Sequence, residues 1–382
     1  MRYSKRLAVK LKSAYSRLSP VNPGKVVFDN IAGKGFGENL KYIAEEIHRR
    51  SMRTKLYWLV DDINTSVPPW ITKIQLGTPR AQHELQTAGF IIYNYRRKWP
   101  FKKKKHQIYL QTWHGGYAMK KIEKDAEDQL PSWYLACARS DGNVTDAVIA
   151  DGKQEEEIYK RAFWLRDGCE ILRTGSPRCD ILFQEHCDPA IRRKVCSALN
   201  IDESYYIVLY APTFRNNGNT DCYLKQTAAL IDALRKKYGN VVLLIRLHPN
   251  VVKYSGGLYD YMPGRIINAS FFPDPQELVI ASDLLISDYS SISFDFAMIR
   301  KPVFLCFKDL EAYKAERDLY PLFYEVPFLT AYTEEELIAQ IETFDVSTYY
   351  KKLDGFFSKY PTYNNGTAAS QIVDWLVKKG MK

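Results

Sequence analysis

The chain has 382 residues, 46% of them hydrophobic and 26% charged, with a formal net charge of +10. This length exceeds one ordinary core and fits two domains, and the composition excludes a disordered protein. No apolar run approaches the ~18 residues of a membrane-spanning helix. The basic charge predicts a polyanionic partner: nucleic acid, anionic lipid or a phosphorylated substrate. Zinc-finger spacing and basic regions that run into heptads are absent from the sequence, so nucleic acid is not expected.

Residues 1–18 are predicted to form an amphipathic helix. Its apolar stripe contains Tyr3, Leu7, Leu11, Ala14 and Leu18, with basic residues around it. Such a helix suits an anionic membrane surface. The alternative is a basic surface helix packed on its own domain. The segment lacks the apolar core of a secretory signal, so we expect a peripheral protein on the cytoplasmic face of the cell membrane. A second basic cluster lies at 96–98 and 102–105, and its run at 102–105 is a candidate for the same contact.

Strand-like and helix-like segments alternate along the rest of the chain. Apolar or β-branched runs predict strands at 25–29, 56–60, 74–76, 90–93, 108–111 and 171–174. A turn with glycines at 33, 35 and 37 follows the first strand, and then a helix with Leu40, Ile43 and Ile47 on one face. The second half predicts strands at 206–210, 241–245, 284–286 and 302–306, and a helix over 227–238 that ends at Gly239.

This alternation predicts an α/β fold of two Rossmann-like, doubly wound domains. We place an N-terminal domain at residues 1–190 and a C-terminal domain at 191–382, because a polar stretch at 184–189 leads into a basic helix. The final helix is a candidate to pack back on the N-terminal domain. Ligands of open α/β sheets bind at the carboxyl ends of strands, so we expect a cleft between two such domains.

The seven cysteines, at 137, 169, 179, 187, 196, 222 and 306, are odd in number and include no Cys-x-x-Cys pair. Neither a disulfide framework nor a zinc site is predicted, and buried reduced thiols are expected. Carboxylate clusters that would indicate a metal site are also absent from the sequence. We therefore expect metal-independent chemistry and no cofactor.

Polar residues follow the predicted strand at 108–111. Residues 111–116 read QTWHGG, so His114 precedes two glycines, Gly115 and Gly116. Glycines let the backbone approach a ligand, and an imidazole can accept a proton near neutral pH. The alternative is a histidine that only caps a turn.

Two strand ends in the second half carry further candidates. Residues 210–215 (YAPTFR) end an apolar strand at Pro212 and present the hydroxyl of Thr213. Residues 245–249 (IRLHP) put Arg246 and His248 two positions apart, which points both to the same side of a strand. Two converging donors suit a diphosphate.

Residues 286–295 (ISDYSSISFD) run from a strand into a helix. Ser290 or Ser291 can act as the N-cap, which leaves backbone N–H groups and hydroxyls aimed at an anion. Asp295, one turn later, can accept hydrogen bonds from a ribose or polyol hydroxyl. The alternative is a well-capped helix without a ligand.

Together these segments resemble the CDP-glycerol glycerophosphotransferases of bacterial teichoic acid and capsule assembly. The resemblance spans about residues 25–370 and keeps the order of the segments at 31–34, 111–115, 120–121, 175–178, 210–215, 246–249, 288–295 and 365–366. Gly116-Tyr117 stands where the family usually has Thr-Pro, Ser176 replaces a common Tyr, and Asn365 replaces a common Asp.

The resemblance implies a GT-B fold whose C-terminal domain holds most of the donor. It also implies in-line attack by an acceptor hydroxyl on the phosphorus that bears the polyol, with CMP leaving. The predicted catalytic residues are His114, as general base, and His248. The predicted donor-binding residues are Trp113, Gly115, Gly116, Arg178, Pro212, Thr213, Arg246, Ser290, Ser291 and Asp295.

The expected partners are a CDP-polyol donor, a lipid-linked saccharide or polyol-phosphate acceptor, and an anionic membrane surface. Two alternatives remain open: transfer of ribitol phosphate from CDP-ribitol, and a nucleotide-sugar glycosyltransferase on the same fold. A non-catalytic membrane-binding scaffold fits less well, because it does not explain why polar residues collect at strand ends.

Overall fold

The computed structural model describes residues 18–97, 103–215, 220–247, 264–316 and 318–382. His248 lies outside the described residues, and so does the predicted N-terminal helix apart from Leu18. Within these ranges, no helix combines the length and the apolar character that crossing a bilayer requires. Two compact units make up the chain: unit 1 is Met1–Gly116, Ile122–Asp180 and Thr362–Lys382, and unit 2 is Tyr117–Lys121 and Ile181–Pro361. This division falls earlier than the boundary expected at residue 190.

Unit 1 is built on a parallel sheet of seven strands in the order β3-β2-β1-β4-β5-β6-β7. The strands are β1 (Asn22–Asp29), β2 (Lys55–Val60), β3 (Thr72–Gln75), β4 (Ala88–Tyr93), β5 (Ile108–Gln111), β6 (Ala147–Ile149) and β7 (Glu170–Leu172). The helices are α2 (Glu38–Arg49), α3 (Pro79–Thr87), α4 (Ser132–Gly142), α5 (Lys153–Ala162) and α15 (Ala368–Lys378), with 3-10 turns η1 (Glu123–Gln129) and η2 (Pro177–Cys179).

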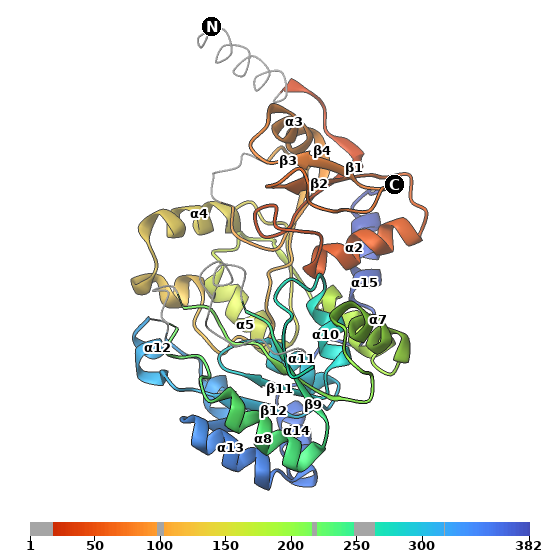
Figure 1. Ribbon diagram of the computed structural model, residues 1–382. Coiled ribbons are helices and arrows are strands. Elements are labelled where there is room, and N and C mark those ends of the chain that lie inside the picture. The colour runs from red at the N-terminus through yellow and green to blue at the C-terminus, as the bar shows by residue number, and fades with distance from the viewer. Residues whose placement is uncertain (1–17, 98–102, 216–219, 248–263, 317) are drawn as a thin grey trace, which may run out of the picture. The chain divides into compact units, whose positions relative to one another are not determined.

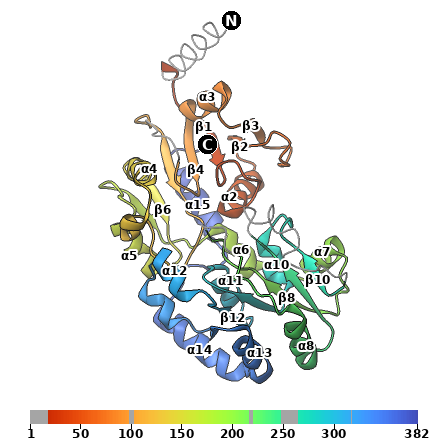
Figure 2. The ribbon, with the colours of Figure 1, turned by 60° about the vertical axis from the view of Figure 1, so that its left-hand side comes forward.

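Helices cover both faces of this sheet, so its strands are almost continuously apolar. On β1, Val26 and Phe28 pack with α2 and α15, whereas Val27 packs on the opposite face with α3. Helices α2 and α15 lie side by side, although they come from opposite ends of the chain (Figures 1 and 2). The two carboxylate oxygens of Asp180 accept from the N–H groups of Ala368 and Ala369, which fixes the start of α15.

Unit 2 contains a parallel sheet of six strands in the order β10-β9-β8-β11-β12-β13. The strands are β8 (Tyr206–Tyr210), β9 (Val241–Ile245), β10 (Ile266–Asn268), β11 (Leu284–Ser287), β12 (Val303–Cys306) and β13 (Leu329–Ala331). The helices are α7 (Pro189–Leu199), α8 (Thr227–Tyr238), α10 (Pro275–Ala281), α11 (Ile292–Met298), α12 (Leu310–Glu316), α13 (Glu334–Thr343) and α14 (Val346–Lys359), with η3 (Pro321–Glu325); α6 (Asp180–Gln184) runs across the division between the units. Helices α8 and α13 cover one face of this sheet, and α7 packs against α10 (Figure 2).

Both sheets have the doubly wound topology that the sequence predicts. In each sheet, the second and third strands are added in turn on one side of the first strand, and the later strands are added on its other side. The order therefore reverses between β1 and β4 in unit 1, and between β8 and β11 in unit 2. In such sheets a ligand binds beyond the carboxyl ends of the two strands that flank the reversal.

Ten of the thirteen strands coincide with strands predicted from the sequence. The three others, β6, β10 and β13, have three residues each, and so does β7, which was predicted. Runs this short carry little periodicity, so periodicity alone finds them unreliably.

Candidate active site

Each sheet has a side-chain hydrogen bond at its reversal point. In unit 1, Asn30 follows β1 and Asn94 follows β4, and the Asn94 carboxamide donates to Asn30 Oδ1 at 2.7 Å. In unit 2, Thr213 follows β8 and Asp288 follows β11, and Thr213 donates to Asp288 Oδ1 through its backbone N–H at 2.8 Å and its hydroxyl at 2.5 Å. The predicted site residues cluster at these two sheet edges.

The His114 loop lies against the residues that follow β4 in unit 1. The N–H of Thr112 donates to the carbonyl of Tyr93 at 2.7 Å. His114 Nδ1 lies 2.6 Å from the carbonyl oxygen of Asn94. Because a carbonyl only accepts, Nδ1 carries the proton of the neutral ring, and Nε2 is left as the proton acceptor. The His114 side chain is exposed, as a general base must be.

Trp113 has a left-handed backbone, with φ of 54°. This conformation costs a bulky residue on the order of 1–3 kcal/mol, so the surroundings must hold it in place. Its N–H donates to Gln111 Oε1 at 2.9 Å, and its ring centroid lies 4.9 Å from that of Phe163. The indole is buried, which makes Trp113 a support for His114 more than a direct contact for a ligand.

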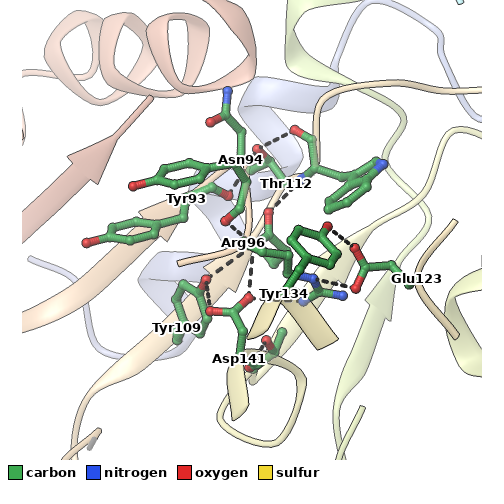
Figure 3. Close-up of polar contacts among 12 residues, drawn as sticks. Tyr93, Asn94, Arg96, Tyr109, Thr112, Glu123, Tyr134 and Asp141 are labelled. Carbon is green, nitrogen blue, oxygen red and sulfur yellow. Dashed lines mark hydrogen bonds and ion pairs between the residues drawn. The ribbon is translucent and has the colours of Figure 1, made fainter. Parts of the chain in front are cut away.

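Arg96, Glu123 and Asp141 form a buried ionic network (Figure 3). The Arg96 guanidinium pairs with Glu123 at 3.2 Å and Asp141 at 3.0 Å, and it lies 5.5 Å from the Trp113 ring. Burial lowers the pKa of Arg96, but the two carboxylates outweigh it and raise the pKa above its usual value. The Tyr134 hydroxyl donates to Glu123 at 2.5 Å, and the Tyr109 hydroxyl donates to Asp141 at 2.9 Å.

Arg96 belongs to the second basic cluster of the sequence, but its side chain is buried and does not contribute to a basic surface. Lys103 of the same cluster pairs with Asp146. The burial was missed because the two partners of Arg96 come from residues 27 and 45 positions away.

Gly116 has a steric reason to be glycine in this chain. A Cβ at this position would lie 1.7 Å from the Oδ2 atom of Asp151, a buried residue just after β6. The carboxylate of Asp151 thus fills the space that any side chain at residue 116 would need. Sequence analysis missed Asp151 because it missed β6.

Arg178 lies in η2, also at the site edge of unit 1. Its side chain is buried, and its backbone N–H donates to Asn39 Oδ1 at 3.1 Å. Asn39 also donates to the carbonyls of Thr112 and Trp113. Unit 1 therefore brings Trp113, His114, Gly115, Gly116 and Arg178 together.

Unit 2 places Pro212 and Thr213 beside a second buried ionic network. Arg215 pairs with Asp288 at 2.9 Å and with Asp309 at 2.7 Å. Its guanidinium lies 5.1 and 4.9 Å from the ring centroids of Tyr289 and Tyr313, which stack on each other. Since Arg215 is buried and neutralised, its role here is to hold Thr213 and the loop after β11. Pro212 is buried at the end of β8.

The other predicted residues of unit 2 lie beyond β9 and β11. Arg246 Nη1 donates to the carbonyls of Ala269 and Phe272 at 3.1 and 2.8 Å. Ser291 occupies the N-cap position of α11, but its backbone is helical and its side chain makes no capping hydrogen bond, unlike the expectation. Ser290 is half-buried, whereas Asp295 is only 1% exposed.

Two parallel sheets of this topology, each with polar residues beyond the carboxyl ends at its reversal point, define a GT-B-like α/β protein. The profile of the CDP-Glycerol:Poly(glycerophosphate) glycerophosphotransferase family matches residues 11–378. The chain belongs to this family.

Relatives and a solved structure agree with this assignment. The chain is 28% identical to the teichoic acid poly(glycerol phosphate) polymerase of Staphylococcus epidermidis, over 95% of the chain and 51% of the relative, so it spans about half of that protein. It is 26% identical to the teichoic acid glycerol-phosphate transferase of Staphylococcus aureus, over 94% of both. A structure of the wall teichoic acid polymerase TagF, in a histidine-substituted form soaked with CDPG, superposes with a TM-score of 0.85 at 25% identity, covering 99% of this chain and 96% of that one.

Proposed function

We propose that the chain transfers a polyol phosphate, glycerol phosphate in the first instance, from a CDP-linked donor to a hydroxyl of a lipid-linked or polymeric acceptor in teichoic acid or capsule synthesis. Membership of the family supports the reaction class. The observation that carries the proposal is His114: its exposed ring has Nδ1 fixed on the Asn94 carbonyl. It lies at the sheet edge where open α/β sheets generally bind ligands.

In this reaction the acceptor oxygen attacks the phosphorus that bears the polyol. Its proton passes to His114 Nε2, the bond between that phosphorus and the bridging oxygen breaks, and CMP leaves with the electron pair. Such a transfer depends on positioning and on neutralising the phosphate charge. We assign charge neutralisation to Arg246, His248 and Arg178.

Further residues are proposed for the remaining donor contacts. Ser290 and Ser291 would bind the diphosphate at the start of α11, Asp295 would accept from a hydroxyl, and Gly115 and Gly116 would let the backbone approach. Pro212 and Thr213 would border the donor. The Thr213 hydroxyl donates to Asp288, so it can only accept from a ligand.

The direct test is CMP release from CDP-glycerol and CDP-ribitol, each supplied with a lipid-linked disaccharide acceptor. The same assay with UDP-sugars tests for a glycosyltransferase. His114→Ala should lower kcat by about 10²–10⁴-fold and leave the KM for the donor within a few-fold, because a base acts in the transition state. The matched control is His106→Ala, an exposed histidine at the other end of β5, which should retain full turnover. A His114→Ala enzyme with more than about a tenth of wild-type kcat would exclude His114 as the base.

We also propose peripheral attachment to the cytoplasmic face of the membrane through residues 2–18. Leu18, the only residue of the predicted stripe within the described ranges, is 87% exposed. Deleting residues 2–18 should reduce sedimentation with anionic vesicles, and high salt should weaken binding of the full chain, because charge attraction is screened within about 10 Å at 0.1 M salt. Neutral phosphatidylcholine vesicles are the control. Undiminished binding of the truncated chain to anionic vesicles would assign the attachment to another surface.

A further inference from the structure

A single buried side chain, Asn39, joins the two segments of unit 1 that carry predicted site residues. Asn39 lies in the first turn of α2 and is fully buried. The loop before it has left-handed backbone at five positions: 31, 32, 33, 35 and 38. This backbone conformation places the Asn39 side chain next to the residues that follow β5.

The carboxamide of Asn39 uses both its donor and its acceptor there. Nδ2 donates to the carbonyl oxygens of Thr112 and Trp113, each at 3.3 Å. Oδ1 accepts from the N–H of Arg178 at 3.1 Å. These partners lie 73, 74 and 139 residues away in the sequence, so the hydrogen bonds of Asn39 connect distant segments of the chain. We call the hydrogen bonds of Asn39 to Thr112, Trp113 and Arg178 the clamp.

The clamp acts on the two residues that precede His114. Because Trp113 is held in a left-handed conformation, its carbonyl and that of Thr112 can accept from one amide. The His114 ring is then held on its other side by the Asn94 carbonyl. The direction of His114 Nε2 is thus set by two contacts, one on the backbone before the ring and one on the ring itself.

We propose that Asn39 is a positioning residue, which fixes the His114 loop and the Arg178 segment relative to each other for phosphoryl transfer. This inference rests on the function proposed above. Misplacement of a reacting group by about 1 Å can cost 10²-fold in rate, so loss of the clamp should appear mainly in kcat.

Gln107 offers a matched control in the same unit. It is also buried, and its Nε2 donates to the carbonyls of Leu85 and Ala88 at 2.8 and 2.7 Å, while its Oε1 accepts from the N–H of Lys104 at 3.0 Å. The hydrogen-bond pattern is therefore that of Asn39. Gln107 precedes β5, at the amino ends of the strands, away from the site.

The experiment compares Asn39→Asp and Asn39→Ala with Gln107→Glu and Gln107→Ala. Asn39→Asp keeps the acceptor for Arg178 and loses both donors, so kcat should fall about 10²-fold while the KM for CDP-glycerol stays within about threefold. Asn39→Ala removes the hydrogen bonds to both the His114 loop and the Arg178 segment, so the KM for CDP-glycerol should also rise. The Gln107 variants should lower Tm by a similar amount yet keep kcat and KM near wild type.

Two kinetic results would overturn the inference: a kcat for Asn39→Asp within threefold of wild type, or an equal loss of kcat in Gln107→Glu. A wild-type protein that releases no CMP would instead refute the proposed function. Amide hydrogen exchange tests the clamp in that case. Asn39→Asp should speed exchange in residues 112–116 and leave the Arg178 N–H protected, whereas unchanged exchange in both segments would overturn the clamp.

Discussion

Replacing Arg96 with methionine tests the buried network under the His114 loop. Methionine keeps most of the volume and the apolar contact with Phe163, whose ring lies 4.4 Å from the guanidinium, but it removes the charge. Glu123 and Asp141 would then remain at 1% and 2% side-chain exposure without their cation. Each would keep one tyrosine hydroxyl as a donor.

Breaking a buried ion pair by removing one partner costs about 3–5 kcal/mol. Two carboxylates lose their cation here, but the tyrosine hydroxyls limit the loss, so we expect about 3–5 kcal/mol at pH 7 and not twice that. This is a large part of the 5–15 kcal/mol that a domain typically has.

Urea denaturation at pH 7 measures this cost. The triple variant R96M/E123Q/D141N removes all three charges and should recover most of the lost stability, since an apolar or neutral core without unpaired charges is tolerated. Arg49→Met is the surface control: Arg49 pairs with Glu46 at 2.6 Å but is 70% exposed, so its loss should cost under about 1 kcal/mol. A loss below about 1 kcal/mol for R96M, or no recovery in the triple variant, would refute this reasoning.

Two further predictions concern donor binding and pH. Arg246→Ala should weaken calorimetric binding of CDP-glycerol more than Ser290→Ala, because each charge-assisted hydrogen bond contributes roughly 1.5–3 kcal/mol; unchanged affinity in both variants would place the donor elsewhere. Burial raises the pKa of Asp29, at the end of β1, to about 6, although Tyr95 and the Gly33 N–H oppose the shift. The folded state therefore holds this proton more tightly than the unfolded chain does. As pH rises from about 4 to 6, the Asp29 contribution to the free energy of unfolding should fall by on the order of 2–3 kcal/mol. Asp29→Asn should remove that dependence, and a stability difference from wild type that does not change with pH would contradict the assignment.

The sequence determined the strands and helices whose pattern is local. Apolar runs such as 241–245 could only be buried strands, and Gly239, with φ of 81°, ends α8 where the helical stripe stops. The sequence also placed the candidate site, because parallel strands bring their carboxyl ends to one edge of a sheet. Polar residues that follow such strands, such as His114, Thr213 and Arg246, therefore lie beyond the carboxyl ends of β5, β8 and β9.

Only the tertiary structure decided which of these residues act on one another. The sequence around Asn39 and Asn94 gives no sign that either asparagine has a special role, because their hydrogen-bond partners come from distant parts of the chain. Arg96 looked like a surface cation until its two carboxylates were placed. Periodicity records which side of an element is buried, whereas hydrogen bonds and ion pairs depend on which elements meet, and that is set by the packing of the whole unit.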